Sequence, residues 1–395
     1  MTTLLTPTII AKESTMQIVD TGVMSRHVFT QYKNEFAKVG STITIRKPNR
    51  FRAIKQVAIN ITDIVEQSTT MVLDTAPTQT AWKFSSIEST TIVEDYSKRY
   101  ITPGSASLTT NMDTDLCALY KDVYNSVGTP GVIPATFKVL GDAQALLTSE
   151  RVPAEGRVAM VNADANWSLA DGLKGTFAQN VAKDIITKGY LGTIANLSIY
   201  EEQNVARHLT GHFTSGATPL MNGATVSGAT TVVTNGWSGA NTVKKGDVFT
   251  IAAVYAVDPL SGASTGKLRQ FVVTADTADA GADMTIPISP AIVTSGPYQT
   301  VDAVPLTTAA LTFMGSQDTY YAQNLVYHPN AFALVTVPIE LPSGVWGSRF
   351  SDPESGISCR VVKQYSIDTD YESIRLDVLA GKKTLDPAFA VRLWS

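Results

Sequence analysis

One change in composition limits this chain more than any other feature. Glutamate occurs on both sides of a long middle segment, yet none lies between Glu202 and Glu340. From about His212 to Thr312 the chain consists mainly of Gly, Thr, Ala, Ser and Val, with short apolar runs such as DVFTIAAV and RQFVVTA. Turn residues separate these runs every 8–12 residues or so, which is typical of a small barrel or sandwich. The sequence therefore predicts an all-β domain over residues 212–312.

The stretch Lys244–Thr274 is the best-defined part of this domain, and it predicts the central hairpin. KKGD supplies a turn into the first strand, and the small-residue loop Pro259–Gly266 separates the two strands. Strict alternation along the first strand would place four residues on the barrel-core side: Phe249, Ile251, Ala253 and Tyr255. The opposite side would then rest on the host domain or on a neighbour.

The segments that flank the β domain mix helical and strand patterns. Helices are expected near Phe137–Leu147 and Ala163–Phe177, and the runs RVAMVN and LSIYEE predict strands between and after them. NLVYHPNAFALVTVPIELP resumes this mixed style after the β segment. The simplest interpretation is a β domain inserted into a loop of an α+β host, because loop tips accept such insertions.

A long apolar stripe predicts the largest helix, Ser105–Val127. At 1.5 Å per residue it would be a rod of about 35 Å. Gly128 and Pro130 follow where a helix C-terminus should fall. Helical spacing also recurs over Pro7–Phe36, interrupted by Gly22.

A basic β-excursion lies between these helices. Ile43 and Ile45 alternate with threonines in GSTITIRKPNRFRAI, and QVAINITDIV predicts a returning strand. The excursion carries the only dense basic cluster of the chain: Arg46, Lys47, Arg50, Arg52 and Lys55. This cluster could face nucleic acid, an acidic neighbouring subunit or only water. An extended arm is costly to order unless something receives it, which favours a partner.

The overall composition excludes several classes of protein. The 395 residues carry a net charge of −4, whereas a general nucleic-acid binder needs a basic surplus. Cys117 and Cys359 are too few for a disulfide framework or a zinc cage. The chain has no secretory signal at its start and no run of about 18 or more apolar residues, so we expect no membrane contact.

The search for catalytic chemistry yields only weak candidates. GWSG, Gly236–Gly239, is one residue short of a nucleophile elbow. His208 and His212 have metal-ligand spacing only on a helix, and in a strand their side chains lie about 13 Å apart. Asp276, Asp279 and Asp283 are better interpreted as part of a solvated loop than as a calcium site. Asp113 and Asp115 lie two positions apart on the predicted helix, so they would face different ways. Cys117 is expected to be a packed core thiol. We therefore predict no catalytic, cofactor-binding or metal-binding residue, and no enzyme.

Several blocks together resemble a known family. They are GSTITIRKPNRF, VEDYSKRYITP, LYKDVYNSVGTPG, DGLKGTF, NLVYHPNAFALVTVPIELP and the stretch from Lys244 to Asp276. These blocks resemble the major capsid (coat) proteins of tailed bacteriophages, most closely the P22-like coat protein group with its Hong Kong 97-type capsid fold. The resemblance runs in order from about residue 5 to about 390.

The resemblance implies a domain for each part of the chain. Residues 1–36 would be the N-terminal arm, 37–80 the extended β-loop, and 81–135 the peripheral domain with the spine helix. Residues 136–211 would begin the axial domain, 212–312 would be the inserted β-barrel, and 313–395 would complete the axial and peripheral domains. The loop residues Arg46, Lys47, Arg50 and Arg52 then become candidates for a subunit interface.

The resemblance also implies function and partners. The chain would assemble with itself into hexamers, pentamers and an icosahedral virion shell around double-stranded DNA, without sequence-specific DNA binding, in the bacterial host cytoplasm. A portal protein would be a partner. The spine helix leaves no room before it for a cleavable scaffolding segment, which implies a separate scaffolding protein; self-assembly without one stays open. The alternatives are a tail-tube or head-completion protein and a nanocompartment shell.

Overall fold

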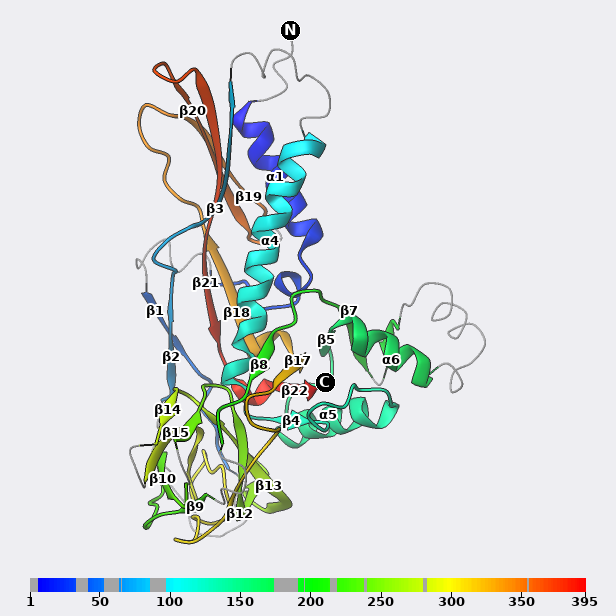
Figure 1. Cartoon of the computed structure of the whole chain (residues 1–395), viewed down its shortest axis with the longest axis vertical. Coiled ribbons are helices and arrows are strands. Elements are labelled where there is room, and N and C mark those ends of the chain that lie inside the picture. Colours follow the sequence, from blue (N-terminus) through cyan, green and yellow to red (C-terminus); the bar gives the residue numbers. More distant parts are fainter. Residues whose placement is uncertain are drawn as a thin grey trace. The chain divides into compact units, whose positions relative to one another are not determined.

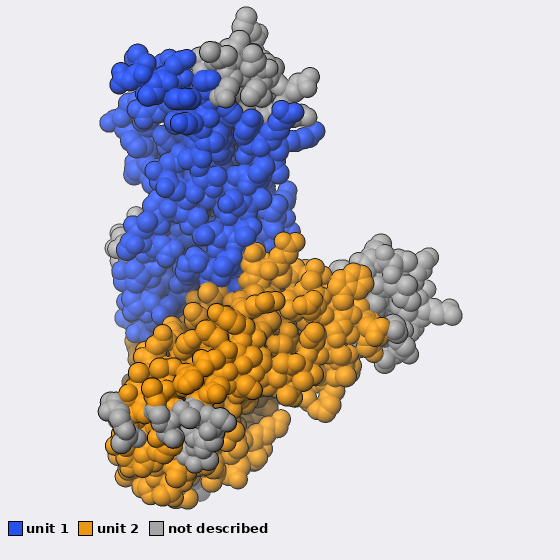
Figure 2. Space-filling model, in the orientation of Figure 1, with its two compact units in different colours: residues 1–46, 68–117, 332–385 blue, residues 47–67, 118–331, 386–395 orange. Residues whose placement is uncertain are grey.

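The computed structural model describes most of the chain: residues 6–32, 42–52, 64, 66–85, 97–173, 191–194, 196–213, 219–237, 240–279, 283–353 and 355–395. The chain forms two compact units, which Figure 2 shows in different colours. Unit 1 comprises residues 1–46, 68–117 and 332–385, and unit 2 comprises 47–67, 118–331 and 386–395. Lys55, Ser238, the end of the helix expected over Ala163–Phe177 and nearly all of the expected returning strand lie outside the described residues.

Unit 1 is built from two helices packed on an antiparallel sheet (Figure 1). The helices are α1 (Pro7–Thr21) and α4 (Thr102–Cys117). The sheet has the order β18-β21-β20-β19, with β3 also paired to β21. Its strands are β3 (Thr78–Ser85), β18 (Phe332–Val337), β19 (Trp346–Ser351), β20 (Ser358–Ser366) and β21 (Tyr371–Thr384). Apolar side chains of both helices and of β20 and β21 share one core, because each element is apolar along the side that faces the others.

The basic excursion begins in unit 1 as a two-stranded sheet. β1 (Thr42–Arg46) pairs antiparallel with β2 (Ser68–Val72), from Thr42 opposite Val72 to Arg46 opposite Ser68. The predicted alternation on β1 is confirmed, since Ile43 and Ile45 are buried while Thr42, Thr44 and Arg46 are exposed. The two isoleucine side chains pack with Met71 and Val335 in a small apolar core.

Unit 2 contains a seven-stranded mixed sheet in the order β4-β22-β17-β5-β7-β6, with β8 also paired to β17. The strands are β4 (Ser126–Val127), β5 (Val158–Val161), β6 (Thr193–Ile194), β7 (Leu197–Glu201), β8 (Arg207–Leu209), β17 (Tyr320–Tyr327) and β22 (Ala390–Trp394). Helices α5 (Phe137–Ser149) and α6 (Ala163–Leu173) share the core on one face of this sheet. The helices and strands expected from residue 137 to residue 202 are therefore present wherever the structure describes the chain.

The expected all-β domain is also in unit 2, and it is a closed barrel. Its strands follow the order β16-β12-β13-β15-β10-β9. They are β9 (Leu220–Met221), β10 (Ala229–Asn235), β12 (Val248–Val257), β13 (Ser264–Val273), β15 (Met284–Ile292) and β16 (Leu311–Phe313), with a short pair β11 (Thr242–Val243) and β14 (Thr277–Ala278). The ring closes where Met221 N–H donates to Ala309 O and Leu311 N–H donates to Pro219 O, both at 2.9 Å. Closure removes free edges, and the barrel has its own apolar core.

The predicted side-chain alternation on β12 is correct only for its first half. Phe249 and Ile251 enter the barrel core as expected. Ala253 then adopts a positive φ of 61°, and the register with β13 shifts, so the strand carries a bulge. The bulge reverses the alternation, and Val254 rather than Tyr255 lies in the core. The hairpin loop is also shorter than expected, because Ser264–Gly266 belong to β13.

The outer side of the hairpin packs on the host, as expected. Val248 and Val272 share a second apolar cluster with Tyr124, Tyr321 and Trp394. The side chain of Trp394 comes from β22, so the barrel rests on the sheet of its own unit.

The predicted helix Ser105–Val127 is wrong at its C-terminal end. Helix α4 ends at Cys117, and a 3-10 helix continues over Ala118–Asp122. Ser126 and Val127 instead form β4, which pairs parallel with β22. The apolar residues after Asp122 therefore serve the sheet of unit 2.

Candidate assembly surface

The four predicted interface residues divide into two pairs. Arg46 is the last residue of β1 and is exposed. Lys47 is held through its backbone, since its N–H donates to Gln67 O at 2.8 Å. The structure thus places these two basic side chains at the end of the β1–β2 ladder.

Arg50 and Arg52 make contacts within their own chain. Arg50 lies 3.6 Å from the carboxylate of Asp386, as a partly exposed ion pair of small energetic value. Arg52 Nη1 donates to Gln299 Oε1 at 2.9 Å, and its Nε and Nη2 atoms are buried without a partner. Tyr298 Oη also donates to Asn49 Oδ1 at 3.4 Å. This part of the excursion therefore lies against the barrel loops of unit 2.

A buried polar cluster surrounds His208, one of the weak candidates of the sequence analysis. Both nitrogens of its imidazole ring have a hydrogen-bond partner: Nε2 lies 2.8 Å from Asp247 Oδ1, and Nδ1 lies 3.0 Å from Tyr120 Oη. Burial lowers the pKa of His208 below its usual value, although the hydrogen bond to Asp247 opposes the shift. Burial also raises the pKa of Tyr120 to about 12. The imidazole is accordingly neutral at pH 7.

Arg392 completes this cluster from β22. Its guanidinium donates to Gly246 O at 2.6 Å and to Val123 O at 2.9 Å, and it lies over the Tyr120 ring. Burial lowers its pKa to about 10. Because Gly246 and Asp247 form the turn into β12, the cluster joins the barrel to the host sheet. Side chains this far apart in sequence carry no local signal, so sequence analysis could not have found it.

The other candidate histidine, His212, and two of the loop carboxylates have partners within the chain. His212 is exposed and contacts Asp318. Asp276 accepts the N–H of Lys245, and Asp283 accepts from Asn222 Nδ2 at 3.0 Å. Across the parts of the chain that the structure describes, no three His, Cys, Asp or Glu side chains form a group that could hold a metal ion.

The two carboxylates near the end of α4, Asp113 and Asp115, face different ways, as expected. Asp113 is buried and accepts the backbone N–H groups of Val23 and Ser25, both at 3.0 Å. Burial raises its pKa, and those hydrogen bonds oppose the rise. Asp115 instead contacts Lys382. Asp113 therefore joins α4 to the segment that follows α1.

Both cysteines, and Trp237 of the short GWSG motif, are buried. Cys117 is a buried thiol 3.5 Å from Met24 Sδ, which confirms the expected core position. Cys359 is buried as well, and burial raises its pKa to about 12, so its thiolate is suppressed. Trp237 is buried in the barrel core and donates from Nε1 to Thr234 Oγ1 at 2.9 Å.

Comparison with known families identifies the protein class. The model of the family described as "P22 coat protein - gene protein 5" matches residues 4–393. The chain therefore belongs to the P22 coat protein family, and its fold is the α+β capsid fold of the Hong Kong 97 type. It is a major capsid protein whose copies assemble into the shell of the virion. A tail-tube, head-completion or nanocompartment protein is not favoured.

Solved structures show distant similarity. The chain is 14% identical to a structure titled "Mycobacterium phage Che8", with 94% of this chain and 90% of that chain covered and a TM-score of 0.48. It is 9% identical to "Capsid of Ralstonia phage GP4", covering 95% and 90%, with a TM-score of 0.48. The "CUS-3 coat protein I-domain" is 24% identical over 26% of this chain and 99% of that chain, with a TM-score of 0.20. No curated protein matches this sequence.

Among the helices that the structure describes, none is long and apolar enough to cross a membrane.

Proposed function

We propose that this coat protein forms hexamers and pentamers of an icosahedral shell that encloses the double-stranded DNA of a tailed bacteriophage. The observation that carries the proposal is the family match over residues 4–393, which includes both units and the barrel. Assembly takes place in the bacterial host cytoplasm. A separate scaffolding protein and a portal protein are the expected partners, and DNA is enclosed without sequence-specific contacts, in keeping with the net charge of −4.

The protein is proposed to act without catalytic turnover. The support comes from the polar residues themselves, because the buried polar cluster around His208 has a structural role between barrel and host. An activity that co-purifies with the protein and disappears on a single substitution would contradict this.

The proposed domain roles follow the family. Residues 1–36 would act as the N-terminal arm, 37–80 as the extended loop, 81–135 as the peripheral domain and 136–211 with 313–395 as the axial and remaining peripheral parts. The barrel, proposed over 212–312, would brace the subunit. Its closed hydrogen-bonded ring and its contact with β22 support this bracing role.

The basic excursion is proposed to form a subunit interface through Arg46, Lys47, Arg50 and Arg52. Oppositely charged surfaces attract over about 8–10 Å at ordinary salt, which accelerates assembly and makes it salt-sensitive. Within the excursion, Phe51 is 64% exposed, so its apolar side chain is available to a partner.

The test separates the two pairs of basic residues. Arg46→Ser with Lys47→Ser should leave the subunit folded and slow shell formation, measured by light scattering and electron microscopy. Arg50→Ser with Arg52→Ser removes the contacts to Asp386 and Gln299, so it should also loosen the excursion within the free subunit. If the quadruple substitution assembles at the wild-type rate, the basic loop is not an interface.

A further inference from the structure

Two loops of the barrel receive part of the basic excursion. These receptor loops are residues 258–263, between β12 and β13, and residues 293–300, after β15. Arg52 Nη1 donates to Gln299 Oε1 at 2.9 Å, and Tyr298 Oη donates to Asn49 Oδ1 at 3.4 Å. All of these residues belong to unit 2, so the contact lies within one compact unit.

A glycine in the first receptor loop makes room for the arginine. A Cβ atom at Gly262 would lie 2.5 Å from Arg52 Nη1 and 2.9 Å from its Cζ, closer than a side chain can approach. Gly262 also has a positive φ of 73°, a conformation that favours glycine. The guanidinium therefore lies directly against the backbone of this loop, and a larger residue there would force Arg52 away from Gln299.

The receptor loops are fixed by hydrogen bonds of their own. Gly262 N–H donates to Asp258 O at 2.8 Å, and the carboxylate of Asp258 accepts two hydrogen bonds from Arg151, at 3.0 and 2.7 Å. Gln299 Nε2 donates to Val301 O at 2.9 Å, which leaves its amide oxygen for the excursion. The acceptor is therefore oriented before the excursion arrives.

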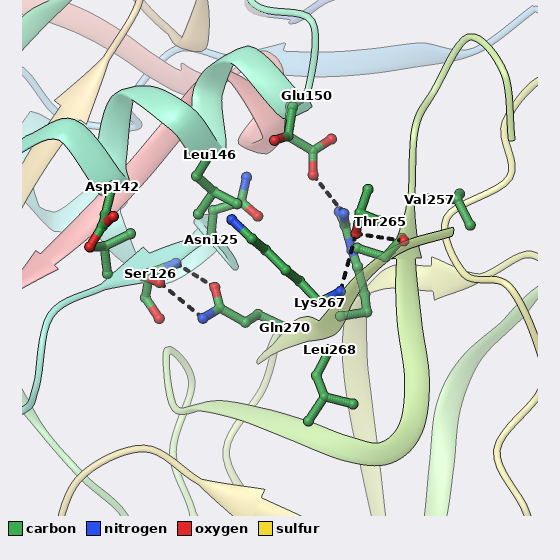
Figure 3. Close-up of a pocket in the computed structure, with 14 residues that line it drawn as sticks. Asn125, Ser126, Asp142, Leu146, Glu150, Val257, Thr265, Lys267, Leu268 and Gln270 are labelled. Atoms are coloured by element: carbon green, nitrogen blue, oxygen red, sulfur yellow. Dashed lines mark hydrogen bonds and ion pairs between the residues drawn. The ribbon is translucent and has the colours of Figure 1, made fainter. Parts of the chain in front are cut away.

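The strand that follows the first receptor loop is anchored to the host sheet. Figure 3 shows the side-chain amide of Gln270, on β13, bonded to Ser126 of β4. The amide accepts from Ser126 N at 2.6 Å and donates to Ser126 O at 2.9 Å. Glu150, directly after α5, accepts from Arg269 Nη1 of β13 at 2.6 Å. These bonds hold the hairpin in place independently of the excursion.

The excursion itself is held weakly on this surface. Arg52 donates to a neutral amide, and its Nε and Nη2 atoms are buried without a partner among the described residues. A guanidinium gains most from a carboxylate, and buried donors without an acceptor are costly. The ion pair of Arg50 with Asp386, at 3.6 Å, is partly exposed and adds little. The two unpaired nitrogens are enclosed, so another molecule reaches them only after Arg52 has left the receptor loops.

We propose that the docked excursion is a reversible latch, which withholds Arg50 and Arg52 from a neighbouring copy until assembly releases them. Both arginines are candidates for the subunit interface, and both are engaged within their own chain. The two uses compete, because one side chain cannot contact the receptor loops and a neighbour at once. The undocked fraction of subunits therefore limits the assembly rate. The docking rests on the contacts within unit 2, whereas its effect on assembly rests on the proposed interface.

The first test measures release in the free subunit with trypsin, which must take an arginine side chain into its own pocket before it cleaves. The bond after Arg52 is cut only when Arg52 has left Gln299, so the cleavage rate follows the undocked population. Gly262→Ala places a Cβ against the guanidinium and should raise this rate about tenfold, as expected for the loss of one hydrogen bond to a charged group. Gln299→Ala should act similarly because it removes the acceptor.

Gly266→Ala is the matched control on the same hairpin. Its φ of 69° is close to that of Gly262, yet a Cβ there would meet no atom within 4 Å. The substitution therefore carries a similar backbone cost without touching Arg52, and cleavage should stay at the wild-type rate. Unchanged cleavage after Arg52 in both Gly262→Ala and Gln299→Ala would overturn the latch.

The second test follows shell formation by light scattering. Gly262→Ala and Gln299→Ala should accelerate it by up to about tenfold, in proportion to the undocked fraction, and Gly266→Ala should match the wild type. Neither Gly262 nor Gln299 belongs to the proposed interface, so a faster rate reports on the released excursion. An unchanged or slower rate would show that docking does not withhold the arginines and would overturn the proposal. If the wild-type protein forms no shells, the proposed function fails together with the effect on assembly, while trypsin cleavage still decides the docking.

Discussion

The barrel and the basic excursion are both antiparallel β-structure, but they satisfy their backbones differently. The barrel joins β9 to the segment before β16 and so closes on itself. The described part of the excursion forms a two-stranded sheet of β1 and β2, in which each strand has an edge that the other does not cover. The barrel buries Phe249 and Phe271 completely, whereas the excursion leaves Phe51 64% exposed.

This contrast indicates where each region obtains its stability. A closed ring with its own core has little need of a partner. An open two-stranded sheet with an exposed aromatic and a basic cluster gains stability when another surface covers it. The barrel therefore suits bracing within one subunit, and the excursion suits contact between subunits.

The largest expected effect compares two phenylalanines. Phe271→Ala removes a ring that is fully buried and stacked on Phe249 at 5.9 Å, and it should lower the unfolding free energy by about 3–5 kcal/mol. Phe51→Ala should change it by less than about 0.5 kcal/mol, because surface substitutions rarely do more. Urea denaturation measures both. Phe51→Ala should instead slow assembly, and a large loss of stability in that variant would contradict the contrast.

Hydrogen exchange provides a second comparison with a smaller expected difference. Amides of β12 and β13 should exchange only through global opening of unit 2, whereas those of β1 and β2 should exchange through local opening. We expect the free subunit to show exchange at least about 100-fold faster in β1 and β2. Assembly into shells should reduce this difference. Equal protection in the free subunit would show that the excursion is as stable as the barrel.

The smallest effect concerns the junction of barrel and host. The folded-state pKa of His208 lies below its usual value of 6.5 because of burial. The unfolded chain therefore binds a proton first as the pH falls through 6.5, so the unfolding free energy should decrease below that pH. The groups that face the ring are Tyr120, Asp247, Arg392 and Lys121.

Denaturation curves at several pH values test this. His208→Gln should flatten the dependence, and part of it should remain because burial also lowers the pKa of His328. An unchanged slope in His208→Gln would assign the dependence to other groups.

Local patterns determined much of the fold in advance. The apolar periodicity of α5 and the alternation on β1 predicted elements that the structure contains. Composition and turn spacing predicted the barrel, because both are properties of residues close together in the sequence. The family resemblance added the capsid fold and the shell function, which the family match bears out.

Only the tertiary structure determined how distant residues meet. The end of α4 was mispredicted because Val127 fits the helical spacing but belongs to strand β4, and periodicity alone does not separate the two. The bulge at Ala253 depends on the paired strand, which the alternation pattern does not include. The buried cluster around His208 brings together residues more than a hundred positions apart, such as Gly246 and Arg392. The buried ion pair between Glu150 and Arg269 spans a similar distance in the sequence. Such side chains meet only when whole helices and strands pack together, and no short stretch of sequence encodes that packing.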